Sequence, residues 1–217
     1  MKWLRRNQDG HTGVAKSPEP PTPFTKPVLP SLAPVLHRAA GHGTQVVRLP
    51  AQPGPVVLML THQAPGHFVV DALDDRLHSV SQLVYTGGPF VGRFLLGGSD
   101  ARARALRVRA DGPWTAESTP LAAAPVLTAE EHRPASDVLH HTGSPATALL
   151  RYEGDAGSDD GGHFLVDTFS PDGTRFLGEL ANQVGGRSAS VRCVCRPLDV
   201  PRPTRHSSPC AVMRTSE

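Results

Sequence analysis

From Thr44 to residue 120, the chain alternates short runs rich in Val, Leu and Phe with short groups of Gly, Pro and Asp. Runs of this length, bounded by turn-forming residues, are typical of β-strands. We therefore expect strands at 45–49, 56–61, 67–72, 77–86, 92–96, 105–110 and 114–117. Short strands at this spacing predict an antiparallel sandwich or jelly roll.

The run at 105–110 has the alternation of a half-buried strand. Leu106, Val108 and Ala110 alternate with Arg107 and Arg109. Because successive side chains of a strand point to opposite faces, the apolar residues can be buried while the arginines stay in solvent.

The same region contains a compact basic cluster, formed by Arg102, Arg104, Arg107 and Arg109. No aromatic residue is interleaved with them, and the formal charge of the chain is only +2. Surfaces that bind single-stranded nucleic acid combine basic with aromatic side chains. We therefore expect a solvated strand edge, where arginines also discourage edge pairing, and no nucleic-acid partner.

An internal repeat is the strongest pattern in the chain. The residues at 66–71, GHFVVD in one-letter code, return at 162–167 as GHFLVD. The flanks agree, because 46–47 corresponds to 138–139, 55–60 to 146–150, and 85–88 to 183–186. A period of about 95 residues indicates duplication of a whole domain rather than an array of short repeats.

The segments outside the repeat complete the predicted organisation. Prolines recurring between 18 and 30 predict a disordered leader over 1–43, in which 31–40 has the pattern of a short helix. The first module spans 44–120, a linker 121–135, and the second module 136–186. After Gly186 no strand pair is evident, so we expect an irregular or disordered tail at 187–217, out of register through a frameshift or a degraded end. The predicted fold class is all-β, with two tandem antiparallel β-sandwich (jelly-roll-like) modules, the second incomplete.

Composition and charge narrow the class of protein further. The 21 glycines and 22 prolines argue against a bundle of long helices. No segment approaches the roughly 20 apolar residues that cross a bilayer, and no apolar run follows the basic N-terminus. The three cysteines lie near the C-terminus and provide no disulfide framework for either module. We expect a cytoplasmic protein without stable membrane insertion.

The repeated strand contains the candidate binding residues, which are His67 and Asp71 with their equivalents His163 and Asp167. Residues four apart in a strand lie about 13 Å from each other, too far for a catalytic His/Asp pair. Two interpretations stay open: a core strand opened by a turn histidine, or a ligand-binding face. The residues expected to be structural are Phe68, Val70, Trp114, Phe164 and Val166, with Trp114 closing the first core.

Metal-ligating residue types occur in three groups. The first contains the histidines of the modules: His62, His67, His78, His140, His141 and His163. The second is a nominal zinc set in the tail, made of Cys193, Cys195, His206 and Cys210, whose alternative is a set of free thiols. The third is a Gly-rich acidic loop with Asp155, Asp159 and Asp160, which we expect to be solvated rather than to bind calcium. We predict no metal, no cofactor and no catalytic residue, because the common catalytic motifs are absent.

The segments 66–71 and 85–88, with the ending ADGPWT at 110–115, resemble tandem β-sandwich repeats of uncharacterised actinobacterial proteins. Those repeats are similar to bacterial pre-peptidase C-terminal and CUB-like modules. The resemblance covers 44–117 well and 136–186 partly, and it carries no catalytic residue to this chain. We expect a non-enzymatic binding or interaction protein for a protein or glycan partner. The alternative is a metal-assisted hydrolase that uses His67 or His163.

Overall fold

The computed structural model describes residues 29–98, 102–128, 135–142, 146–153, 163–184, 188–195 and 210–216. These residues form an all-β fold of antiparallel sheets, as predicted, with one short 3-10 helix, η1, at Leu121–Ala123. Within these ranges, no helix has the length and apolar character required to cross a membrane.

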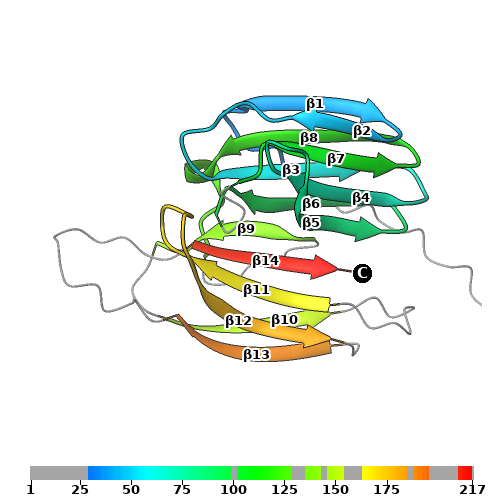
Figure 1. Ribbon diagram of the computed structural model, residues 1–217. Helices are drawn as coiled ribbons and strands as arrows, with labels where there is room; N and C mark the ends of the chain where they lie inside the picture. The colour runs from blue at the N-terminus through cyan, green and yellow to red at the C-terminus, as the bar shows by residue number, and fades with distance from the viewer. Residues whose placement is uncertain are drawn as a thin grey trace, which may run out of the picture.

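The first half of the chain contains two four-stranded sheets (Figure 1). Sheet 1 has the order β1-β8-β3-β6, and sheet 2 has the order β2-β7-β4-β5. The strands are β1 His37–His42, β2 Gln45–Arg48, β3 Val56–His62, β4 Phe68–Leu73, β5 Ser79–Thr86, β6 Phe90–Leu96, β7 Ala105–Ala110 and β8 Pro113–Pro120. The seven strands predicted from the sequence are all present.

Alternate side chains of the two sheets pack into one core, as in a β-sandwich. Phe68 and Val70 of β4 are fully buried there, together with Leu58 and Leu60 of β3. Trp114 of β8 is 2% exposed and belongs to this core, where its indole N–H donates to the Gly43 carbonyl at 3.3 Å. Phe68, Val70 and Trp114 are therefore core residues of the first half.

The structure corrects the helix expected at 31–40. Strand β1 lies there instead and pairs with β8 along its whole length, from His37 opposite Ser118 to His42 opposite Pro113. A Cβ on Gly41 would lie 2.5 Å from Cζ2 of Trp114, so this glycine permits close packing of β1 on the indole ring. Pairing along the edge of β8 outweighs the weak helical preference of the segment.

The second half contains sheet 3, with the order β12-β11-β14-β9, and sheet 4, the pair β10-β13. The strands are β9 Asp137–His140, β10 Ala146–Glu153, β11 His163–Phe169, β12 Phe176–Val184, β13 Ser188–Cys195 and β14 Cys210–Ser216. The expectation of an irregular tail at 187–217 is wrong for β13 and β14. Each forms its ladder with strands distant in sequence, and such pairing overrides weak strand propensity.

The strand orders of sheets 2 and 3 match element by element. β9, β14, β11 and β12 lie next to one another in the same succession as β2, β7, β4 and β5. Irregularities also recur: the β4–β5 ladder shifts after Val70, and the β11–β12 ladder shifts after Val166. Because the position of a β-bulge is usually kept among proteins of one fold, irregularities at equivalent positions agree with the repeat seen in the sequence.

Register gives the equivalent residues of the two halves. Val46 lies in the row of Asp71, and Val138 lies in the row of Asp167, as the sequence comparison predicted. The correspondence of 85–88 with 183–186 is one residue out, because Asn182 lies opposite Leu165 as Tyr85 lies opposite Val69. The loop between the paired strands is one residue longer in the second half, so the offset between equivalent residues rises from 96 at Val69 to 97 at Tyr85, whereas the predicted correspondence required 98.

The two halves are joined by an apolar contact. Val57 of β3 and Leu95 of β6 pack with Val138 of β9 and Phe169 of β11, all at most 3% exposed. Ala124, in the segment predicted as a linker, is buried in the same cluster. The lower and upper halves in Figure 1 are therefore in direct contact.

Candidate functional site

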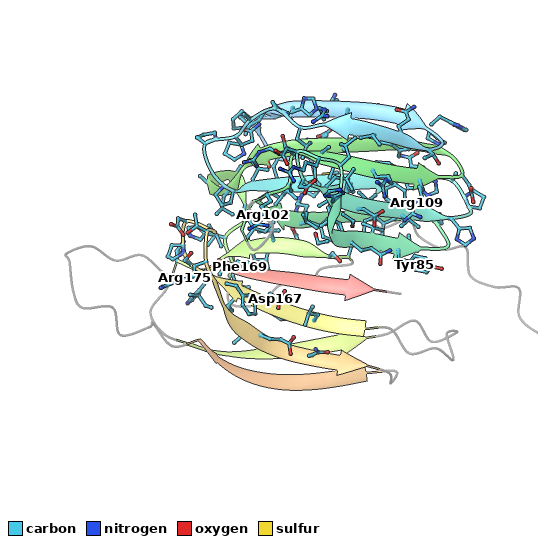
Figure 2. The ribbon with its side chains drawn as sticks, in the orientation of Figure 1. Tyr85, Arg102, Arg109, Asp167, Phe169 and Arg175 are labelled. Carbon is cyan, nitrogen blue, oxygen red and sulfur yellow. The ribbon has the colours of Figure 1, made fainter. Side chains whose placement is uncertain are left out.

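The outer face of sheet 2 brings together polar and aromatic side chains that are distant in sequence. We call it the Tyr85 face and define it by Val46, Val69, Asp71, Tyr85, Arg107 and Arg109. These residues alternate with the core residues of the same strands, so they lie on the side away from the core. Figure 2 shows the Tyr85 and Arg109 side chains on this sheet.

One row of the ladder crosses this face from β5 to β7. Tyr85 is opposite Val69, and Val69 is opposite Arg109. Tyr85 is 63% exposed, and the Arg109 side chain is 51% exposed. Two strand spacings separate their Cα atoms by about 10 Å, which leaves room for a ligand to touch both.

The next row contains an acid and a second arginine. Asp71 lies opposite Arg107 and is 7% exposed, and its Oδ2 accepts a hydrogen bond at 3.0 Å from Nη2 of Arg109. Arg107 Nη2 donates to the Leu77 carbonyl at 3.3 Å. Asp71 therefore orients the Arg109 guanidinium, and the Arg107 charge lies beside a carbonyl that carries no formal charge.

This geometry corrects the expectation of a solvated strand edge. Strand β7 lies between β2 and β4 and is an interior strand of sheet 2. Arg102 and Arg104 precede β7, and Figure 2 places Arg102 toward the opposite end of the sheet from Arg109. The four arginines therefore do not share one patch. Tyr85, two strands away from Arg109 in the same row, is an aromatic residue on the face that the sequence around the arginines does not contain.

The predicted residues of the repeated strand have different surroundings. His67 is exposed and precedes β4, and its backbone N–H donates to Oδ2 of Asp111 at 2.7 Å. Asp71 belongs to the Tyr85 face, whereas Asp167 is half-buried on β11. Val166 is buried at 3%. The side chains of His163 and Phe164 lie outside the described residues.

The cysteines among the predicted zinc ligands of the tail come from two different sheets. Cys193 and Cys195 lie on β13 in sheet 4, whereas Cys210 lies on β14 in sheet 3. His206 and the acidic loop with Asp155, Asp159 and Asp160 lie outside the described residues. Among the residues that are described, no three His, Cys, Asp or Glu side chains form a group able to hold a metal ion.

The other histidines considered as metal ligands, in both modules, lie on different elements. The His62 ring is 1% exposed and stacks on Phe68 with ring centroids 4.8 Å apart. His78 is exposed beside Asp74, with Nδ1 and Oδ2 3.6 Å apart. His140 ends β9, with His141 directly after it. His62 is thus a core residue and His78 a turn residue.

Two aspartates order the turns that join the paired strands. The Asp74 carboxylate accepts hydrogen bonds from the backbone N–H groups of His78 and Arg76, and these bonds lower its pKa. The Asp172 carboxylate accepts from the Ser170 hydroxyl at 2.5 Å and from the Thr174 backbone, and its pKa is lowered too. Both turns favour the charged carboxylate.

A shallow hollow of about 310 Å³ lies on the outer face of sheet 1, with Met59, Thr61, Val91 and Thr115 among its lining residues. Leu29 fills part of it and is 5% exposed. Glu117, which also lines it, already pairs with Arg38 at 2.8 Å and accepts from the Ser31 hydroxyl. The polar group best placed to bind a ligand there is therefore already used by the chain itself.

Tyr85 is the main residue of the face that the sequence did not single out. Its place beside Val69 and Arg109 depends on the bulged β4–β5 ladder, whose register a strand pattern does not reveal. The one sequence signal for this residue was that it is the aromatic side chain of the predicted strand at 77–86.

Comparisons with known proteins add no assignment: no protein-family model matches the sequence, and a search of curated proteins finds no significant match.

Proposed function

We propose that this protein is a non-enzymatic binding protein and that the Tyr85 face is its binding surface. The observation that carries the proposal is the row of Tyr85 and Arg109, both more than half exposed, on strands β5 and β7, which flank β4 in a packed sheet. Tyrosine and arginine are enriched where proteins bind partners, and rigid strands fix their spacing without an entropic penalty.

We also propose that the chain is a tandem duplication in which the first copy has kept the open face. The matching strand orders and bulges support the duplication. Val46 is 48% exposed, whereas its equivalent Val138 is fully buried against the first half. The second copy thus uses part of the equivalent face for the contact between the halves, so we assign binding to the first.

The test is a binding screen of the full chain against a glycan array and a native lysate. The probes are the wild-type protein, Tyr85→Ala and Tyr85→Phe. We expect the wild type and Tyr85→Phe to retain the same partner and Tyr85→Ala to lose it, with unchanged melting temperatures. A partner retained equally by Tyr85→Ala contradicts the assignment of the surface, and the absence of any partner contradicts the proposed function.

No specific observation favours the metal-assisted hydrolase. It requires His67 or His163 as a metal ligand, and His67 is a solvent-exposed residue whose fixed contact is made by its backbone.

A further inference from the structure

We infer that the partner of the Tyr85 face is a carboxylated polysaccharide, an inference that rests on the proposed function. The charges of the face carry the argument. Arg109 and Arg107 contribute two guanidinium groups, and Asp71, the acid between them, is 7% exposed and already paired with Arg109. The accessible charge is therefore positive, and the complementary partner is an anion.

The geometry of arginine favours carboxylate groups on that partner. A guanidinium presents a planar fork of N–H donors that matches the two oxygens of a carboxylate. Asp71 occupies one Nη of Arg109, which fixes the plane of the fork while about half of the side chain faces solvent. Arg107 and Arg109 are two residues apart on one strand, so their Cα atoms are about 7 Å apart. At this spacing the two side chains can contact successive carboxylates of a polymer.

Tyr85 favours a sugar over an acidic peptide. Its ring is 63% exposed on the edge strand β5 and offers an apolar surface with a polar tip, which suits the C–H face and hydroxyls of a sugar ring. Val46, the other exposed apolar residue of the face, lies on the opposite edge strand β2. The face therefore has no central apolar anchor of the kind found in protein interfaces, and its single aromatic offers no platform for successive nucleic-acid bases.

The experiment compares one polymer in two charge states. Binding of the full chain to polygalacturonate, and to the same polymer with its carboxyl groups reduced to alcohols, is measured by affinity electrophoresis and calorimetry in low and high salt. Polyglutamate and single-stranded DNA serve as competitors. We expect binding to the carboxylated polymer alone, weakening as salt rises because exposed charges are screened.

Variants locate the site. We expect Arg107→Gln to weaken binding roughly tenfold, as for loss of one charge-assisted hydrogen bond, and Tyr85→Ala to weaken it about three- to tenfold. Tyr85→Phe should bind as the wild type does. Arg38→Gln is the control, because it removes one exposed positive charge from sheet 1, outside the Tyr85 face.

The outcomes separate this inference from the proposed function. Equal binding of the reduced polymer, still lost in Tyr85→Ala, overturns the inference and leaves the binding face intact. Stronger binding of polyglutamate or DNA overturns it in favour of those partners. Failure to bind polygalacturonate overturns it as well, while a Tyr85-dependent partner in the earlier screen leaves the proposed function standing.

Discussion

Arg93 and Asp137 form a fully buried ion pair between the two halves of the protein. Nη1 of Arg93 lies 2.9 and 3.0 Å from the two carboxylate oxygens of Asp137, and both side chains are 0% exposed. Nη2 of Arg93 also donates to the carbonyl of Pro30. One side chain of β6 thus holds the N-terminal segment and β9 together.

Removing one partner of this pair should be strongly destabilising. Asp137→Ala leaves the Arg93 charge buried without its counter-ion, and we expect a loss of about 3–5 kcal/mol in the free energy of unfolding. The double variant Arg93→Met with Asp137→Leu should recover most of that loss. Arg38→Ala, which breaks the exposed pair with Glu117, should cost under about 1 kcal/mol. Equal costs for Asp137→Ala and Arg38→Ala in urea titrations would contradict the structure of this interface.

Truncation of the core tryptophan tests the first half. Trp114 is 2% exposed among residues of both sheets, so Trp114→Ala creates a cavity and should cost about 3–5 kcal/mol. The measurement is thermal unfolding followed by circular dichroism. An unchanged melting temperature would be incompatible with the position of β8.

Two glycines with nearly the same positive φ distinguish the cost of backbone strain from the cost of lost packing. Gly43 has φ +71° and open space around the position of a Cβ, whereas Gly173 has φ +70° and a Cβ there would lie 2.6 Å from Cδ2 of Leu121. Gly43→Ala should cost about 1–2 kcal/mol, the conformational penalty alone. Gly173→Ala should cost measurably more, because the contact between the halves must also move. The comparison is made by denaturant titration, and equal costs would show that the loop at 170–175 does not pack on the first half.

The lowered pKa of Asp172 makes a prediction about pH. Its carboxylate accepts a hydrogen bond from the Ser170 hydroxyl, so the folded state lowers its pKa below the ordinary value of 3.8. The resulting stability is complete above that value and is lost as pH falls through the folded pKa. Asp172→Asn should therefore lower the melting temperature at pH 7, and the difference from the wild type should shrink as pH falls below 3.8. A difference that is independent of pH would show that the charged form is not the one stabilised.

Strand β14 tests the second half. Val212 lies opposite Asp167 of β11 on one side and Val138 of β9 on the other, so it belongs to an interior strand. Val212→Pro removes a backbone donor from this strand and should cost about 3 kcal/mol or more. An irregular tail would tolerate the substitution. Hydrogen exchange of the β9 and β11 amides checks the result, because protection there should fall first.

Much of the fold was predictable because it follows from local pattern. The alternation of Leu106, Val108 and Ala110 with arginines requires one buried face, and these residues are in the core. The GHFVVD repeat similarly identified Val46 and Val138 as equivalent positions of the two halves, and the register of their sheets agrees. By contrast, the 37–42 segment contains Gly41 and no strong strand former, so only its partner β8 makes it a strand.

The sequence by itself therefore determined the β class, the seven main strands of the first half and the repeat, because these depend on side-chain periodicity within short segments. Only the tertiary structure decided that β14 belongs to sheet 3 and β13 to sheet 4, because local composition does not reveal which distant strands a segment pairs with. It also decided the Tyr85 face. Tyr85 and Arg109 are placed in one row, on either side of Val69, by the register of three strands, and a bulge in one ladder alters which side chains share a row.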